Sequence, residues 1–196
     1  MNEQPNAHQG TRARIQEVAL ELFTEHGYEA TSLREIAERL GVTKAALYYH
    51  FKSKDEIVSS FMEDRAAALE RLVAWGRTQP RTPQTRCEVL RRYGEQLART
   101  NHHMVMRFLE RNQAALREHP KSESMREVMT SMTELLCDPA DPLPVRLKSS
   151  MALFAMHGVW FIARDEPYTD QERTEAALAV ALDLIESADT DRAATR

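Results

Sequence analysis

Cysteine is scarce in this chain, with only Cys87 and Cys137 among 196 residues. Two cysteines cannot build a disulfide framework, so we expect a protein of the reducing cytoplasm. Long apolar runs are also missing, because the longest one, residues 151–163, has 13 residues and is too short to span a bilayer. The polar first ten residues do not have the pattern of a signal peptide. These features predict a cytoplasmic protein with no membrane partner.

Glycine is equally sparse, and its six residues are scattered. Phosphate-binding loops and dinucleotide-binding motifs need clustered glycines, and the sequence contains no nucleophile elbow and no pair of residues with metal-ligand spacing. The neighbouring His102 and His103, with a distant His119, do not match the spacing of a metal site. We therefore expect no catalytic residue, no metal and no cofactor, and a protein that is not an enzyme.

Alternation of apolar and polar residues, the pattern of a half-buried strand, is absent, and apolar residues recur at helical spacing instead. The sequence predicts an all-α protein of about nine helices: 11–26, 32–40, 44–50, 54–75, 83–100, 102–118, 122–137, 144–164 and 170–187. We expect a small domain at 11–56, a larger helical domain at 57–187, and disordered tails at 1–10 and 188–196.

Lysine is rare too, with 5 residues against 21 arginines in a chain of net charge −4. Three of the five, Lys44, Lys52 and Lys54, nevertheless fall within eleven residues. They lie in the stretch GVTKAALYYHFKSKDE, residues 41–56, beside two tyrosines and a histidine. Because the whole chain is mildly acidic, any binding of nucleic acid must depend on such a local cluster.

Two short helices that meet at Gly41 form a helix-turn-helix pattern. Ser32 and Glu35 have the spacing of a capping box, and Thr43 is the predicted N-cap of the second helix. Gly41 can adopt the left-handed backbone of a tight turn, and Leu47 would pack the second helix on the first. In such a unit the second helix enters the major groove of DNA.

With Leu47 facing inward, the opposite face of the second helix carries alanines, tyrosines and a lysine. Alanine can touch a thymine methyl group, and lysine can donate to guanine. Tyrosine and threonine hydroxyls and the N–H groups at helix starts suit phosphate oxygens. His50 could either contact DNA or pack against the core beside Leu47.

Residues 11–57, above all TSLREIAERLGVTKAALYYHFKSKDEI, closely resemble the DNA-binding domain of the TetR family of bacterial repressors. The segment LYYHFKSKDEI is highly specific to that family. The resemblance implies an all-α homodimer whose N-terminal domains bind a palindromic operator, and whose C-terminal domain typically binds a small molecule that releases the DNA. It also implies DNA contacts from Thr43, Lys44, Ala45, Tyr48, Tyr49, His50 and Lys54, with Thr31, Ser32 and Arg34 as further candidates.

Methionine is concentrated in the second half, where seven of nine residues lie between 104 and 156. Methionine adapts to irregular apolar surfaces, so this region is either a pocket for a small, largely apolar molecule or an ordinary helical core. The polar His157 and Asn112 could bond to a ligand or to the protein itself. The candidate ligand-binding residues are Trp75, Tyr93, Met104, Phe108, Asn112, Met129, Phe154, His157 and Trp160.

The last two helices, 144–164 and 170–187, suit homodimerisation. Met151, Ala155, Gly158 and Ile162 form one stripe, with the small residues Ala155 and Gly158 at its middle. A matching face of small residues is expected on the last helix at Ala177, Ala181 and Leu184. The sequence as a whole favours a ligand-responsive dimeric repressor of transcription. A DNA-binding regulator without a ligand, or an activator, is the alternative.

Overall fold

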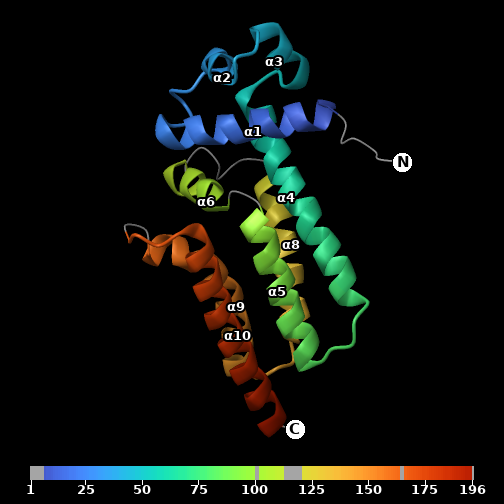
Figure 1. Cartoon of the computed structure of the whole chain (residues 1–196). Helices are drawn as coiled ribbons and strands as arrows, with labels where there is room; N and C mark the ends of the chain where they lie inside the picture. Colours follow the sequence, from blue (N-terminus) through green and yellow to red (C-terminus); the bar gives the residue numbers. More distant parts are fainter. Residues whose placement is uncertain (1–6, 100–101, 113–120, 164–165, 196) are drawn as a thin grey trace, which may run out of the picture. The chain divides into compact units, whose positions relative to one another are not determined.

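A computed structural model describes residues 7–99, 102–112, 121–163 and 166–195 (Figure 1). Within these ranges the chain forms helices and no strand, which confirms the predicted all-α class. The described helices are α1 (Ala7–Glu25), α2 (Leu33–Leu40), α3 (Lys44–His50), α4 (Lys54–Arg77), α5 (Pro83–Arg99), α6 (His102–Arg111), α8 (Lys121–Leu136), α9 (Leu143–Ile162) and α10 (Asp170–Ala194). Among them, none is both long and apolar enough to cross a membrane.

Several helices begin where the sequence carries a capping signal. The Ser32 hydroxyl accepts the N–H of Glu35 at the start of α2, at 3.2 Å. At the start of α10, the Thr169 hydroxyl accepts the N–H of Glu172, and the Glu172 carboxylate accepts the N–H of Thr169 at 2.7 Å. These side chains satisfy backbone donors that the first turn of a helix leaves unpaired, which explains why both starts can be read from the sequence.

The two ends of the described chain differ from the predicted tails. α1 begins at Ala7, inside the expected tail 1–10, and α10 continues to Ala194, through most of the expected tail 188–196. The C-terminal prediction is wrong because Ala188 is buried and because charged residues of this last stretch form ion pairs within the protein. The predicted helix 102–118 is described only as far as residue 112, and its remainder lies outside the described residues.

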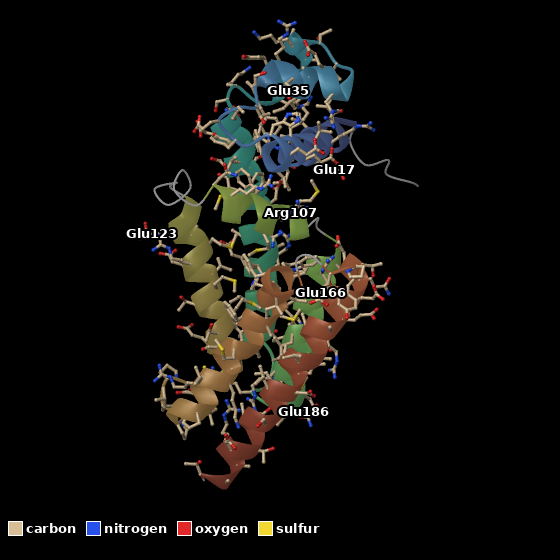
Figure 2. All side chains as sticks on the ribbon, turned by 90° about the vertical axis from the view of Figure 1, so that its left-hand side faces the viewer. Glu17, Glu35, Arg107, Glu123, Glu166 and Glu186 are labelled. Atoms are coloured by element: carbon tan, nitrogen blue, oxygen red, sulfur yellow. The ribbon has the colours of Figure 1, made fainter. Side chains whose placement is uncertain are left out.

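The chain divides into two compact units. The N-terminal unit takes its described residues from 1–65 and 104–122, and the C-terminal unit takes its own from 66–103 and 123–196. α4 contributes its first half to the N-terminal unit and its second half to the C-terminal unit, whereas most of α6 belongs to the N-terminal unit. Charged side chains cover the surfaces of both units, for example Glu17 on α1 and Glu186 on α10 (Figure 2).

The core of the N-terminal unit joins α1 to α4 with α6. Its centre is an aromatic cluster in which the ring of Phe108, from α6, lies 5.6 Å from Phe23, 5.7 Å from Phe61 and 6.1 Å from Tyr28. All four aromatic side chains are buried, and the inward residue of α3, Leu47, belongs to the same core. The apolar stripe of α3 is thereby fixed against the rest of the unit, and the opposite face of α3 is left outside.

The core of the C-terminal unit is built from α4, α5, α8, α9 and α10. α10 packs along both α9 and α5, and the small residues Ala177 and Ala181 lie buried at this packing. Small side chains let helices approach closely, which explains their place in the middle of α10. They are therefore used within the subunit and are not the exposed matching face that the sequence predicts.

Candidate nucleic-acid interface

The turn between α2 and α3 depends on Gly41. Its backbone angles, φ 69° and ψ 27°, lie in the left-handed region that residues with a Cβ atom rarely adopt. The Gly41 N–H donates to the Glu38 carbonyl at 3.1 Å, and the next N–H, of Val42, donates to the Ala37 carbonyl at 3.0 Å. These bonds satisfy the last carbonyls of α2 and end that helix at a defined residue. A short hydrogen-bonded turn therefore joins α2 directly to α3.

α3 is fixed at both ends. The Thr43 hydroxyl accepts the N–H of Ala46 at 3.1 Å and caps the first turn. Leu47 and the residue after the helix, Phe51, are fully buried. Since the hydroxyl oxygen of Thr43 is an acceptor in the cap, its own O–H can still be donated to a phosphate oxygen.

The outer face of α3 carries the residues for which the resemblance implies DNA contacts. Lys44 and Ala45 are exposed, Tyr49 is 70% exposed, and Tyr48 and His50 are half-buried. The ammonium group of Lys44 lies 5.3 Å from the centre of the Tyr48 ring. The Tyr49 and His50 rings meet edge to face at 5.4 Å. The structure therefore brings cationic, hydroxyl and small apolar groups together on one face of a capped helix.

The start of α2 contributes Ser32 and Arg34, both of which are exposed. The Arg34 side chain donates to Glu38 at 2.7 Å, but exposed pairs of this kind contribute little and exchange readily. Both residues remain candidates for contacts with the DNA backbone.

Thr31 does not fit its predicted contact with DNA. It is only 1% exposed, and its hydroxyl lies 2.8 Å from the Gly27 carbonyl and 3.2 Å from the Leu22 carbonyl. The hydroxyl thus ties the turn after α1 to the end of α1. Because its partners are backbone groups inside the unit, Thr31 is not part of the candidate interface.

A family model described as bacterial regulatory proteins, tetR family, matches residues 15–61, a stretch that contains α2 and α3. PfmR, a TetR family transcriptional regulator from Thermus thermophilus, has a solved structure that is 32% identical to this chain. The match covers 88% of this chain and 96% of PfmR, with a TM-score of 0.59. The chain belongs to the TetR family. This confirms the resemblance seen in the sequence.

Curated relatives of this TetR-family chain match over shorter stretches. The regulator AcrR from Shigella flexneri is 49% identical over 28% of this chain and 26% of AcrR. The repressor KstR2 from Rhodococcus jostii (strain RHA1) is 38% identical over 34% of this chain and 35% of KstR2. This chain therefore spans about a quarter to a third of the length of these relatives. All three proteins are named as regulators or repressors of transcription and not as enzymes, in agreement with the expectation from the sequence.

Lys54 of the TetR-family chain is placed differently from Lys44. Its ammonium group donates to the carbonyl oxygens of Tyr28 and Glu29, at 2.5 and 3.2 Å, and lies 4.6 Å from the centre of the Tyr28 ring. The buried Tyr28 phenol donates to Asp55 at 2.5 Å. Sequence reasoning missed Tyr28 and Asp55. The available signal was a tyrosine directly after Gly27, where the chain leaves α1 and an apolar contact with the helix is common.

Replacement of Tyr28 by phenylalanine is expected to change how stability depends on pH in the alkaline range. Burial, reinforced by the hydrogen bond to Asp55, raises the pKa of Tyr28 well above its ordinary value of 10.0. The folded state therefore holds this proton more tightly than the unfolded state. The resulting stabilisation is complete below pH 10 and is lost as the pH rises toward the folded-state pKa. Urea unfolding between about pH 8 and pH 11 should show a steeper alkaline loss in the wild type than in Tyr28→Phe, and equal slopes would contradict this assignment.

Three of the predicted ligand-binding residues belong to the N-terminal unit. Phe108 is fully buried in the aromatic cluster, and Met104 packs against the same core. The side-chain amide of Asn112 donates to the Phe108 carbonyl at 2.8 Å, so this polar group is satisfied at the end of α6. The structure therefore places all three in the core or at a helix end, and Asn112 makes an internal hydrogen bond of the kind that one of the two alternatives expects.

The other six predicted ligand-binding residues belong to the C-terminal unit. The Tyr93 hydroxyl and His157 Nε2 lie 2.8 Å apart, so these two polar groups satisfy each other. The guanidinium of Arg92 lies 3.8 Å from the centre of the Trp75 ring, and that of Arg173 lies 5.6 Å from the centre of the Trp160 ring. Met129 packs against the core, whereas Phe154 is 58% exposed.

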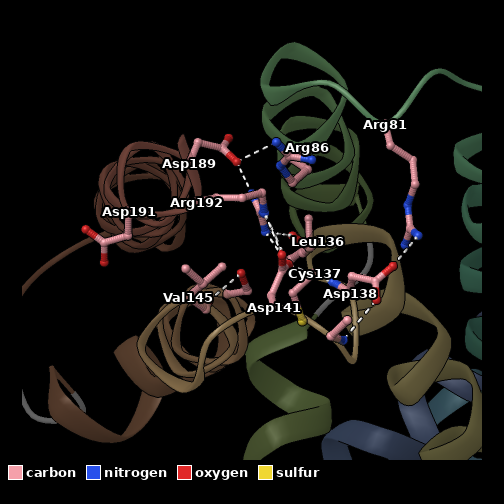
Figure 3. A network of polar contacts seen from close by, with 12 residues as sticks. Arg81, Arg86, Leu136, Cys137, Asp138, Asp141, Val145, Asp189, Asp191 and Arg192 are labelled. Atoms are coloured by element: carbon pink, nitrogen blue, oxygen red, sulfur yellow. Dashed lines mark hydrogen bonds and ion pairs between the residues drawn. The ribbon is translucent and has the colours of Figure 1, made fainter. Parts of the chain in front are cut away.

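A cavity of about 400 Å³ does occur in the C-terminal unit, but none of the predicted ligand-binding residues lines it. Its walls hold a buried network of ion pairs (Figure 3). Arg86 contacts Asp189 at 2.5 Å, and Arg192 contacts Asp189 and also Asp141, the latter at 2.8 Å. The Arg192 hydrogen bond lowers the pKa of Asp141 below its ordinary value. Two arginines and two aspartates make up this network, so its charges balance. Its ion pairs link α5, α10 and the turn before α9.

An apolar stripe on α9 faces outward. Leu143, Leu147, Phe154 and Ile162 are 73%, 57%, 58% and 81% exposed. Their spacing places them along one side of the helix. Together with Met151, these four residues of α9 define the α9 stripe. On α10, Val180 is also half exposed. The α9 stripe corresponds to the region in which the sequence predicts a dimer contact, although Ala177 and Ala181 are not part of it.

Proposed function

We propose that this chain is a dimeric repressor of transcription that binds a palindromic DNA operator through α2 and α3. The outer face of α3 is the observation that carries the proposal, because it presents Lys44, Ala45 and Tyr49 on a helix whose inner face is fixed in the core. Such a helix can enter the major groove without rearrangement of the protein. The relatives named as regulators and repressors of transcription support the same function.

The chemistry of the face assigns different tasks to its residues. Lys44 at the start of α3 can donate to guanine, and Ala45 can touch a thymine methyl group. The hydroxyls of Thr43, Tyr48 and Tyr49 suit phosphate oxygens, as do Ser32 and Arg34 at the start of α2. His50 is half-buried with its ring against Tyr49, so it supports that side chain and can donate from its ring edge.

A recognition helix of seven residues makes few base contacts. Two copies that bind two half-sites would supply the missing affinity and specificity, which favours a homodimer and a palindromic operator. We assign this dimer contact to the α9 stripe. The dimer would act in the cytoplasm, where the operator is found. An apolar stripe with four residues more than half exposed is unusual for a face that remains in water.

Release of the operator by a small, largely apolar molecule completes the proposal. Such a molecule must bind more tightly to the conformation that does not bind DNA, or it shifts nothing. α4 is the segment through which the shift would pass, because residues of this one helix belong to both units. Trp75, Tyr93, Met129, Phe154, His157 and Trp160 remain the candidates for contacts with the molecule.

A regulator without a small-molecule ligand, whether repressor or activator, is the second candidate. The hydrogen bond between Tyr93 and His157 favours it, because the two most polar candidates already satisfy each other. An apolar molecule that displaced this contact would leave both groups unpaired at considerable cost.

Selection of genomic DNA fragments by the purified protein, followed by sequencing, is the test of the proposed function. We expect a shared palindrome. With that operator, Lys44→Ala should weaken binding by about tenfold or more, which corresponds to the loss of one good base contact. Tyr48→Phe should weaken it less, and the oligomeric state should be unchanged in both variants. Arg91→Ala, which removes an exposed positive charge from α5, is the control and should bind normally. Wild-type affinity in both α3 variants would remove the assignment of the recognition helix.

A further inference from the structure

The cavity of about 400 Å³ in the C-terminal unit has two kinds of wall. Leu135, Leu136 and Pro83 provide its apolar part. Arg86 and Asp189 belong to its charged part. Pockets for small molecules commonly combine an apolar lining with a few polar groups and have volumes of about 300–1,000 Å³. A water molecule takes only about 30 Å³ of liquid volume, so the cavity is large enough for a small organic molecule.

The charged part of the wall has an exposed rim and a buried interior. Arg81 and Asp138, which also line the cavity, form an ion pair at 3.2 Å, and their side chains are 59% and 50% exposed. The side chains of Arg86 and Asp189 are only 9% and 10% exposed. A molecule that enters past the exposed pair would therefore meet charged groups that are screened from water.

The buried pair has hydrogen-bonding capacity that the protein does not use. A terminal nitrogen of Arg86 contacts Asp189 Oδ1 at 2.5 Å, and Arg192 binds the same oxygen (Figure 3). Within the described part of the chain, Arg86 Nε and Asp189 Oδ2 are buried and have no hydrogen-bond partner. Buried polar groups in native proteins almost always have one. A donor and an acceptor are thus left over on two side chains that already touch.

The balance of charge indicates which chemical group these two atoms would bind. Arg86 and Arg192 are paired with Asp189 and Asp141, so the network has no net charge. An ion would lose its water here without meeting a net opposite charge, which is costly. An uncharged group that carries a donor beside an acceptor has no such cost. A primary amide has this pattern, because its N–H bonds lie next to its carbonyl oxygen.

We infer that this cavity binds a small uncharged molecule that presents a primary amide, or another adjacent donor and acceptor, to Asp189 and Arg86. The amide N–H donates to Asp189 Oδ2, and the amide oxygen accepts from Arg86 Nε. The terminal torsion of an aspartate is broad, so a small turn presents Oδ2 to the cavity while Oδ1 keeps its arginines. The rest of the molecule lies against the apolar wall. This site is separate from the residues proposed above for an apolar effector, and its existence does not depend on operator binding.

Three probes of nearly the same shape test this pattern on the wild-type full chain. Benzamide carries a donor and an acceptor, benzoate carries acceptors only, and protonated benzamidine carries donors only. We expect benzamide to bind with a dissociation constant of about 1 mM or lower. The two ions should bind at least about tenfold more weakly, because each leaves one buried group unpaired.

Titrations followed by NMR of the backbone amides measure the three affinities and locate the probe. The largest shifts should fall on residues that line the cavity, such as Arg86, Leu136 and Asp189. Shifts centred instead on Trp75 and Trp160 would overturn the inference, and so would benzoate or benzamidine binding as tightly as benzamide. If none of the three binds at up to about 10 mM, water alone fills the cavity and the inference fails, whether or not an operator is found.

Asp189→Asn adds a test in which the preference should reverse. An amide nitrogen, which is a donor, takes the place of Oδ2, so the cavity then offers two donors and an additional positive charge. Benzoate should bind this variant at least about tenfold more tightly than it binds the wild type, and benzamide should bind more weakly. Arg77→Met is the control, because it removes an exposed arginine of the same unit that does not line this cavity. It should keep the wild-type order of affinities. An unchanged order in Asp189→Asn, with helix content intact by circular dichroism, would contradict the inference, and if this variant does not fold the wild-type series decides.

Discussion

Replacement of Arg192 by methionine is expected to lower the free energy of unfolding by about 3–5 kcal/mol, the usual cost of removing one member of a buried ion pair. The Arg192 side chain is 11% exposed, and its partners Asp141 and Asp189 are 12% and 10% exposed. It also donates to the Leu136 carbonyl at 3.2 Å, at the end of α8 (Figure 3). Methionine would fill much of the space but leave the Asp141 carboxylate, which is only 12% exposed, without its cation.

Arg77→Met is the matched control for this prediction. Arg77 lies 3.7 Å from Glu134, and both side chains are more than half exposed. Exposed pairs contribute about 0–1 kcal/mol, so the same substitution should have little effect here. Urea unfolding monitored by circular dichroism measures both variants. A similarly small decrease in the free energy of unfolding in both variants would show that the Arg192 network is solvated and does not stabilise the fold.

The ion pair of Arg192 and Asp141 also predicts how the stability of the protein depends on pH in the acidic range. Arg192 lowers the pKa of Asp141 below its ordinary value of 3.8, so the folded state binds this proton less tightly than the unfolded state. The pair's stabilisation is present above pH 3.8 and is lost as the pH falls through the folded-state pKa. The wild type should therefore lose stability more steeply than Arg192→Met below about pH 4.

This network also shows why the end of α10 could not be predicted. The last stretch of the chain is rich in charged and small residues, a composition that normally belongs to a solvated tail. Asp189 and Arg192 pair with each other three residues apart, but their other partners, Arg86 and Asp141, are distant in the sequence. Nothing in a local pattern indicates such pairs. Helix starts at Ser32 and Thr169 could be predicted because their capping partners lie only three residues away.

The candidate interface was predictable to the same extent. The outer face of α3 follows from helical periodicity once Leu47 is placed inside. Thr31 has the side chain of a DNA-binding residue, but its partners are backbone carbonyls, which every residue has and no sequence marks. Phe108 was assigned to a pocket because an apolar stripe has the same spacing whether it lines a cavity or fills a core.

The α9 stripe gives the second large expected effect. Leu147→Asp and Phe154→Asp should each convert the proposed dimer into monomers at micromolar concentration, with a dissociation constant raised at least about 100-fold, or roughly 2.8 kcal/mol. A carboxylate placed in an apolar contact must lose its water without gaining a partner. Both side chains are more than half exposed in the subunit, so the fold of the monomer should not change. Sedimentation velocity measures the assembly, and circular dichroism checks the helix content.

Ala98→Asp is the control, because it adds the same charge at an exposed position on α5. It should remain dimeric. The two α9 variants should also lose affinity for the full palindrome by about 100-fold or more while keeping the weak affinity of one subunit for a half-site, since α3 is untouched. Dimers that persist in both variants would place the subunit contact on another face. Loss of the dimer with unchanged operator affinity would instead show that one recognition helix is enough, and the argument from palindromy would fail.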